Sequence, residues 1–244
     1  MKIALAQIQT QAGAIEQNLQ LHINCCKQAA TLGADLIVFP ELSITNYEPL
    51  LAKELAFTLT DKRLQLLQQI SNTHHLIIAA GLPLLTEDGI AIATVFLKPN
   101  SLPGIYYKTY LHADELPFFV SVDNATVTPL PDVAFAICYE LSVPQHAASV
   151  ALQQPQLYIA SVAKTSKGVL ESETRLAQLA KENCCPVLFV NAVGPADNFV
   201  NDGHSFVINK EGLLLHQLDG NTPALLFFDT STKVCTTHLL EHDK

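Results

Sequence analysis

The sequence lacks an excess of basic residues. It has 14 Lys and Arg against 23 Asp and Glu, which gives a formal net charge of −9. Such a chain has no electrostatic footprint for nucleic acid and no basic amphipathic stretch for an anionic membrane surface. Hydrophobic residues make up 49% of the chain and charged residues 15%, which is typical of a globular protein. We therefore expect partners that are neither nucleic acid nor membrane.

Long apolar runs are also missing. No stretch approaches the ~20 apolar residues of a membrane span. The N-terminal run from Ile3 to Ile8 is short and is interrupted by Gln7, so it does not resemble a secretory signal. We expect a cytoplasmic protein.

Paired-cysteine motifs are absent as well. The six cysteines include no C-x-x-C, and Cys25–Cys26 and Cys184–Cys185 lie within apolar segments. This pattern favours reduced thiols over a disulfide framework, and it signals neither zinc nor thioredoxin-type chemistry. We expect His146 to face outward or to pack, and His204 to be structural, rather than either to pair with a cysteine in a catalytic dyad.

Short strand-like runs alternate with helical patterns in both halves of the chain. Helices are predicted over residues 15–31, after Thr60 or Asp61, from about Pro144, and over residues 171–183. Many strands are apolar on both faces, so both surfaces of each sheet should be covered. We predict a single α/β domain of two β-α-β halves over residues 1–235, followed by a loose tail over residues 236–244.

Three apolar strands each end in a reactive side chain. Glu41 follows Leu36–Pro40. It could be a solvated acidic residue in a loop, or partial burial could raise its pKa toward that of a general base. Lys108 follows Tyr106-Tyr107, where it could be an edge-strand residue or an electrostatic stabiliser of a developing oxyanion. Cys138 lies between an apolar strand and a helix start, where backbone N–H groups favour a thiolate nucleophile.

The segments FPEL, YYK and ICYE occur in that order, and together they resemble the three signatures of the carbon–nitrogen hydrolase (nitrilase) superfamily, in its amidase and N-carbamoyl amidase branch. The flanking segments MKIALAQIQT, KENCCPVLFVNAVG and DGHSFVINKEGLLL extend this resemblance over almost the whole chain. It implies a four-layer α-β-β-α sandwich, usually paired as a homodimer or a higher homo-oligomer, and a reaction that requires neither metal nor organic cofactor.

The resemblance also implies roles for individual residues. It makes Glu41 the general base, Lys108 the stabiliser of the tetrahedral intermediate and Cys138 the nucleophile. The backbone N–H of Tyr139 would be a second oxyanion donor. Glu115, in preference to Asp114, would position the substrate.

Other positions match or depart from the family pattern. Tyr47 matches an aromatic residue that lines the pocket. Asn46 replaces a glycine, and asparagine tolerates a left-handed backbone. Ser142 replaces an arginine that meets a substrate carboxylate in some amidases, and Gln145 replaces a common glutamate.

The departure at Ser142 bears on substrate charge. Without that arginine, and with Asp114, Glu115 and Glu140 near the expected pocket, we expect neutral or amine-bearing substrates to be preferred. Lys164, Lys167 or Arg175 could still supply a positive charge.

The function expected is hydrolysis of a small linear amide or an N-carbamoyl amine through a cysteine thioester. Two alternatives stay open. One is a nitrilase or an acyltransferase of the same superfamily, and the other is a catalytically idle binding or scaffold protein.

Overall fold

The computed structural model describes residues 1–122 and 128–240, and it contains a seven-stranded sheet, a five-stranded sheet and a two-stranded ribbon over these ranges. The larger sheet has the order β14-β13-β1-β2-β3-β4-β5, and the smaller has the order β12-β11-β8-β7-β6. The strands of the larger sheet are β1 Lys2–Gln7, β2 Leu36–Val38, β3 Ile77–Leu85, β4 Ile90–Leu97, β5 Gly104–Tyr107, β13 Ala224–Asp229 and β14 Cys235–Leu239. Those of the smaller sheet are β6 Val133–Ile137, β7 Leu157–Val162, β8 Val187–Asn191, β11 Phe206–Ile208 and β12 Leu214–Gln217, and the ribbon pairs β9 Val193–Ala196 with β10 Phe199–Asp202.

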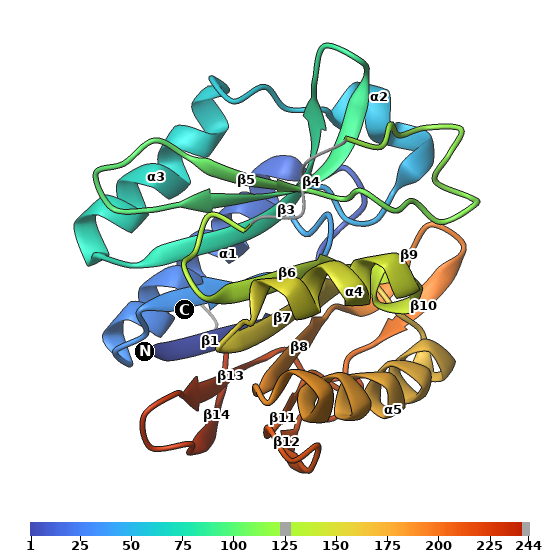
Figure 1. The fold of residues 1–244 in the computed structure, drawn as a ribbon. Helices are drawn as coiled ribbons and strands as arrows, with labels where there is room; N and C mark the ends of the chain where they lie inside the picture. The colour runs from blue at the N-terminus through green and yellow to red at the C-terminus, as the bar shows by residue number, and fades with distance from the viewer. Residues whose placement is uncertain (123–127, 241–244) are drawn as a thin grey trace.

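Helices cover the outer face of each large sheet (Figure 1). One buried cluster joins α1 (Ile15–Thr31) and α3 (Lys62–His74) to the larger sheet, and another joins α4 (Pro144–Gln153) and α5 (Ser166–Asn183) to the smaller sheet. The two inner faces pack on each other, so the predicted α/β four-layer α-β-β-α sandwich is confirmed. The helical segments are α1 Ile15–Thr31, η1 Pro49–Leu51, α2 Ala52–Leu55, α3 Lys62–His74, η2 Cys138–Ser142, α4 Pro144–Gln153 and α5 Ser166–Asn183.

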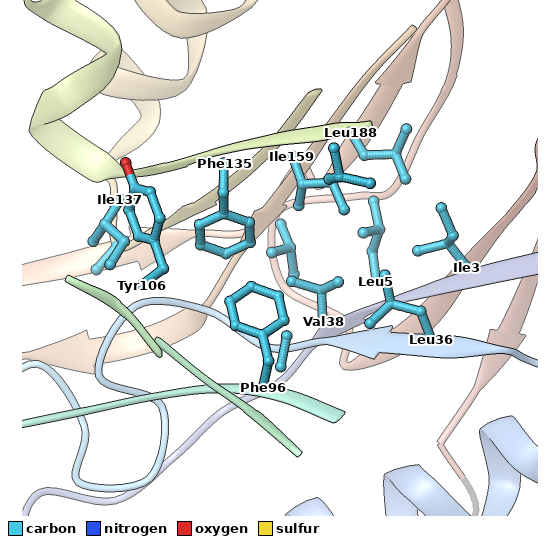
Figure 2. Close-up of a cluster of buried hydrophobic side chains, with 14 of the residues drawn as sticks. Ile3, Leu5, Leu36, Val38, Phe96, Tyr106, Phe135, Ile137, Ile159 and Leu188 are labelled. Carbon is cyan, nitrogen blue, oxygen red and sulfur yellow. The ribbon is translucent and has the colours of Figure 1, made fainter. Parts of the chain in front are cut away.

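The central core lies between the two sheets. Figure 2 shows Phe96 and Tyr106 of the larger sheet facing Phe135 and Ile137 of the smaller one. The Phe96 and Phe135 rings meet edge to face with centroids 5.3 Å apart, an arrangement that aromatic quadrupoles favour. This packing fixes the distance between the two sheets, whose strand ends carry the reactive residues.

Helix starts follow local capping. The side chain of Asp61 accepts a hydrogen bond from the Arg63 N–H at 2.8 Å, which confirms the expected start of α3. Helix α5 begins at Ser166, earlier than predicted, because Thr165 caps it through the N–H of Gly168 at 3.5 Å. The polar residues of its first turn hid this start in the sequence.

The expected loose tail is wrong for residues 236–239. These residues belong to β14, which pairs antiparallel with β13 along its outer edge. A polar edge strand has little hydrophobic signal because most of its side chains face water, yet its backbone groups still complete the ladder. Residues 241–244 lie outside the described residues, and the domain boundary at residue 235 stays a prediction.

The turn that carries Glu41 presses against β3 at Gly81. A Cβ atom at Gly81 would lie 2.5 Å from the Leu42 nitrogen and 2.6 Å from the Pro40 oxygen. Both distances are shorter than real contacts allow, and both neighbours are backbone atoms. Only glycine therefore lets the two segments lie this close.

Gly81→Ala should lower the free energy of unfolding by about 1–3 kcal/mol, since the turn at Leu42 must move to accept the methyl group. Denaturant titration of the variant against the wild type measures this loss. An unchanged transition midpoint would contradict the tight packing of this turn on β3.

Candidate active site

Three strand ends bring Glu41, Lys108 and Cys138 together from separate parts of the chain. Glu41 follows β2 in the larger sheet, and Lys108 directly follows β5. The Lys108 N–H donates to the Ile92 oxygen at 2.8 Å, which extends the pairing of β5 with β4. Cys138 follows β6, at the edge of the smaller sheet. The face-to-face packing of the sheets makes these ends neighbours.

A buried ionic cluster occupies this meeting point. Lys108 Nζ donates to Glu41 Oε1 at 2.7 Å and to Glu115 Oε1 at 2.5 Å. The Tyr47 hydroxyl donates to the same Glu115 oxygen at 2.9 Å, and the His112 N–H donates to Glu115 Oε2 at 2.7 Å. Glu115 is thus held by three separate donor groups and lies between Lys108 and the loop at His112.

The backbone before Tyr47 is left-handed. Asn46 has φ of 65°, in the region where asparagine was expected to be tolerated. Its side-chain amide donates to the Pro195 oxygen at 3.1 Å, and its oxygen accepts from the Thr10 hydroxyl at 3.0 Å. These bonds hold the turn that directs Tyr47 toward Glu115.

The pKa values of Glu41 and Lys108 are both raised above their usual values, which suits proton transfer. Burial raises the pKa of Glu41 to about 7; Lys108 opposes this rise and Glu115 adds to it. Burial acts to lower the pKa of Lys108, but Glu41 and Glu115 outweigh it, so the pKa is raised and the ammonium stays charged. The cluster therefore offers a carboxyl that exchanges its proton near neutral pH beside a permanent cation.

Cys138 has a backbone conformation and surroundings of its own. Its φ is 44°, where β6 turns into the η2 segment, and its thiol contacts the Ala163 oxygen at 3.7 Å. Burial raises the pKa of Cys138 to about 11, and the charge of Glu41 adds to the rise. The thiol therefore needs a base. Among the described residues, buried Glu41 Oε2 has no conventional hydrogen-bond partner, and the thiol lies near enough to lower the pKa of Glu41.

A cavity of about 260 Å³ gives access to Cys138. Glu41 and Lys108 are buried behind the wall of this cavity. Lys108 is bonded to the lining residue Glu115, and Glu41 interacts with the lining residue Cys138. Its volume suits a substrate of a few heavy atoms. The lining residues are Tyr47, His112, Asp114, Glu115, Cys138, Tyr139, Ala163, Lys164, Thr165, Gly168 and Phe199.

Glu140 does not face this cavity, which corrects the charge argument made from the sequence. Its Oε2 accepts from the Tyr106 hydroxyl and the Ile137 N–H, each at 2.8 Å, and its Oε1 accepts from the Thr109 N–H at 2.8 Å. The backbone geometry of η2 directs the side chain inward, where these donors satisfy it. Glu140 thereby ties the residue after Lys108 to the residue before Cys138.

Sequence reasoning assigned no role to Ala163, His112 and Phe199, and it named Lys164 only as one of three possible sources of positive charge. Ala163 and Lys164 follow the carboxyl end of β7, and this position in a parallel sheet was the available signal. His112 and Phe199 come from loop and ribbon positions that carried no pattern. Ser142 and Gln145 are exposed and do not line the cavity that holds Cys138.

His146 is not part of the site. It is buried on α4, with Nε2 3.1 Å from the Tyr106 hydroxyl, and burial lowers its pKa to about 4. In residues 1–122 and 128–240, no group of three or more His, Cys, Asp or Glu side chains could hold a metal ion. Within the same ranges, no helix is long and apolar enough to cross a membrane.

The carbon-nitrogen hydrolase family matches residues 2–236. The chain belongs to this family. It is similar to the glutamine-dependent NAD(+) synthetases of Acinetobacter baylyi, with 27% identity over 88% of this chain, and of Thermotoga maritima, with 28% identity over 88%. It spans 41% and 39% of the length of these two relatives.

Solved structures share the fold. An amidase from Nesterenkonia sp. AN1 matches with a TM-score of 0.84 and 23% identity, covering 94% of this chain and 92% of that one. The same amidase in complex with butyramide matches with a TM-score of 0.81 and 22% identity, covering 93% and 89%. These neighbours support the sandwich architecture of a carbon-nitrogen hydrolase.

Glu140→Gln should lower kcat and destabilise the fold by about 1–3 kcal/mol. A glutamine side chain has only one acceptor oxygen. That oxygen can accept either from Thr109 or from Tyr106 and Ile137, and the NH2 group then lies against a backbone N–H donor on the other side. Steady-state kinetics and thermal unfolding measure the two effects. Glu54→Gln makes the same change at an exposed carboxylate and should leave both unchanged; equal behaviour of the two variants would contradict the positioning role.

Proposed function

We propose that this carbon-nitrogen hydrolase cleaves the C–N bond of a small linear amide or an N-carbamoyl amine through a thioester on Cys138. The observation that carries the proposal is the Lys108 ammonium held between Glu41 and Glu115 beside the Cys138 thiol. A nucleophile that lines a small cavity, with a general base and a fixed cation directly behind it, provides the groups that acyl transfer to sulfur needs.

The first half-reaction starts with proton transfer from the Cys138 thiol to Glu41. The sulfur attacks the carbonyl carbon, and the carbonyl π electrons move to oxygen. Lys108 and the backbone N–H of Tyr139 stabilise the oxyanion, because the first N–H groups of a helical turn have no acceptor within it. The C–N bond then breaks, Glu41 gives its proton to the leaving nitrogen, and a thioester remains.

The second half-reaction uses water. Glu41 takes a proton from water as the oxygen attacks the thioester carbon. The tetrahedral intermediate collapses, the C–S bond breaks, and Glu41 returns the proton to sulfur. The acid product leaves and the enzyme regains its starting state, so no redox partner is needed.

The side-chain amide of glutamine is a second candidate substrate. It is favoured by the similarity to glutamine-dependent NAD(+) synthetases across 88% of this chain. The butyramide complex of the Nesterenkonia amidase favours simple aliphatic amides. A comparison of ammonia release from glutamine, butyramide, a carbamoyl amine and a nitrile shows which of these substrates the enzyme hydrolyses. Release from the nitrile alone would indicate a nitrilase. An added amine acceptor tests for acyl transfer. A homo-oligomeric state and a cytoplasmic location stay predictions.

Cys138→Ala should abolish turnover with little change in thermal unfolding, and Cys138→Ser should be nearly inactive because a hydroxyl is a much weaker nucleophile here. Intact-protein mass spectrometry with a slow amide should show an acyl adduct on the wild type and none on Cys138→Ala. Cys184→Ala removes an exposed thiol and should keep both activity and adduct. Turnover by Cys138→Ala would refute the mechanism, and absence of both turnover and adduct in the wild type would favour the idle binding protein.

The rate should fall as pH drops through about 7, since Glu41 acts as a base only when it is ionised and burial raises its pKa to about 7. The negative charge of Glu115 contributes to this rise. Glu115→Gln should therefore move the acidic limb of the kcat/KM profile to lower pH, in addition to lowering the rate. If the acidic limb of the kcat/KM profile does not move in Glu115→Gln, the assignment of Glu41 as the general base is contradicted. The same holds if the residual activity of Glu41→Gln shows an unchanged acidic limb.

A further inference from the structure

The backbone of Lys164 is held by hydrogen bonds in the wall of the cavity that contains Cys138. Its N–H donates to Asn191 Oδ1 at 2.9 Å, and its carbonyl oxygen accepts from Asn191 Nδ2 and from the Asp202 N–H, each at 3.0 Å. A Cβ atom at Gly168 would lie 3.3–3.5 Å from three carbons of the Lys164 side chain. The aliphatic part of the lysine therefore packs along the first turn of α5, which limits where its ammonium can lie.

Lys164 lies close to the Cys138 thiol. Lys164 lines the cavity together with Cys138 and is half-buried. Against the burial and the Glu41 charge that raise the pKa of Cys138, Lys164 has the largest lowering effect, ahead of Lys108. The positive charge of Lys164 is therefore near enough to Cys138 to act on a substrate bound there, and the same side chain also borders the groove lined by Ser142 and Arg175.

The other charged residues of this cavity already have partners. Glu115 is bound by Lys108 and Tyr47, and Asp114 is bound by His112. In the part of the chain that the structure describes, Lys164 makes no salt bridge and its side chain makes no hydrogen bond. A half-buried cation without a partner on the wall of a ligand cavity is a site for an anion.

We propose that Lys164 binds a carboxylate at the far end of the substrate, so that this enzyme prefers a small amide bearing a carboxylate over a neutral or an amine-bearing amide. This rests on the proposed amidase function. It reverses the preference expected from the sequence, which relied on the missing arginine at Ser142 and on Asp114, Glu115 and Glu140 near the pocket. Asp114 and Glu115 do line the cavity, but His112 and Lys108 pair with them. Ser142 lines the groove between α4 and α5, which Lys164 also borders, and it does not line the cavity that holds Cys138. Glu140 is buried and does not line that cavity either.

The test compares kcat/KM for the monoamide of glutaric acid and for pentanamide, a neutral amide with a chain of similar length. The wild type should favour the carboxylate compound. Lys164→Met should lower kcat/KM for it by on the order of 10- to 100-fold more than for pentanamide, mainly through KM. Lys164→Glu should reverse the preference in favour of 5-aminopentanamide, because an amine then meets an acidic partner.

Lys167→Met is the matched control. Lys167 lies three positions further on, and its side chain is 86% exposed and pairs with Glu171. The control should behave as the wild type on all three substrates. An equal loss on both glutaric monoamide and pentanamide in Lys164→Met would mean that Lys164 acts on the thiolate instead, and would overturn the carboxylate site. Unchanged kcat/KM values for both substrates would overturn it as well.

Binding to the inactive protein separates this proposal from the catalytic one. Calorimetric titration of glutaric monoamide into Cys138→Ala should show binding that is weakened by the second change Lys164→Met, and not by Lys167→Met. If the wild type hydrolyses none of the amides, the amidase function fails, yet this titration still supports or refutes the anion site. Equal affinity of Cys138→Ala with and without Lys164→Met refutes it.

Discussion

The buried ammonium of Lys108 is the constraint on which the site depends. A fully buried cation is tolerated only when it is paired and hydrogen-bonded, and removing one partner of such a pair costs about 3–5 kcal/mol. Lys108 has two carboxylate partners, Glu41 and Glu115, which reach it from separate segments of the chain. The need to satisfy one charge therefore fixes the turn after β2, the end of β5 and the loop that follows it relative to each other.

Glu41 and Glu140 are two buried carboxyl groups whose roles differ because they have different numbers of hydrogen-bond donors around them. Burial raises the pKa of each to about 7. Glu140 accepts hydrogen bonds at both oxygens, from Tyr106, Thr109 and Ile137, so it anchors the backbone around the site. Glu41 keeps a buried oxygen that lacks a conventional partner within the described part of the chain. That oxygen is the one available for a proton, which suits a general base.

Patterns within short segments carried much of the information on this fold. The apolar strands, the helix over residues 15–31 and the Asp61 cap could be predicted, because they depend on periodicity and on local hydrogen bonds. The start of α5 and the strand β14 could not, because polar first turns and exposed edge strands leave little hydrophobic signal. The direction of a side chain in an irregular turn was also out of reach, which is why Glu140 was placed in the pocket and Lys164 was left as one of three open alternatives.

By itself, the sequence determined the chemical types available: a carboxylate, a lysine and a cysteine, each directly after an apolar strand, in an order that resembles the carbon–nitrogen hydrolases. Only the tertiary structure decided which of these groups are buried, which are paired and which face a substrate. Burial and pairing arise from residues far apart in the chain, such as Lys108 with Glu41 and Glu140 with Tyr106. Desolvation and Coulomb energy depend on these distances in space, and distance along the chain does not determine them.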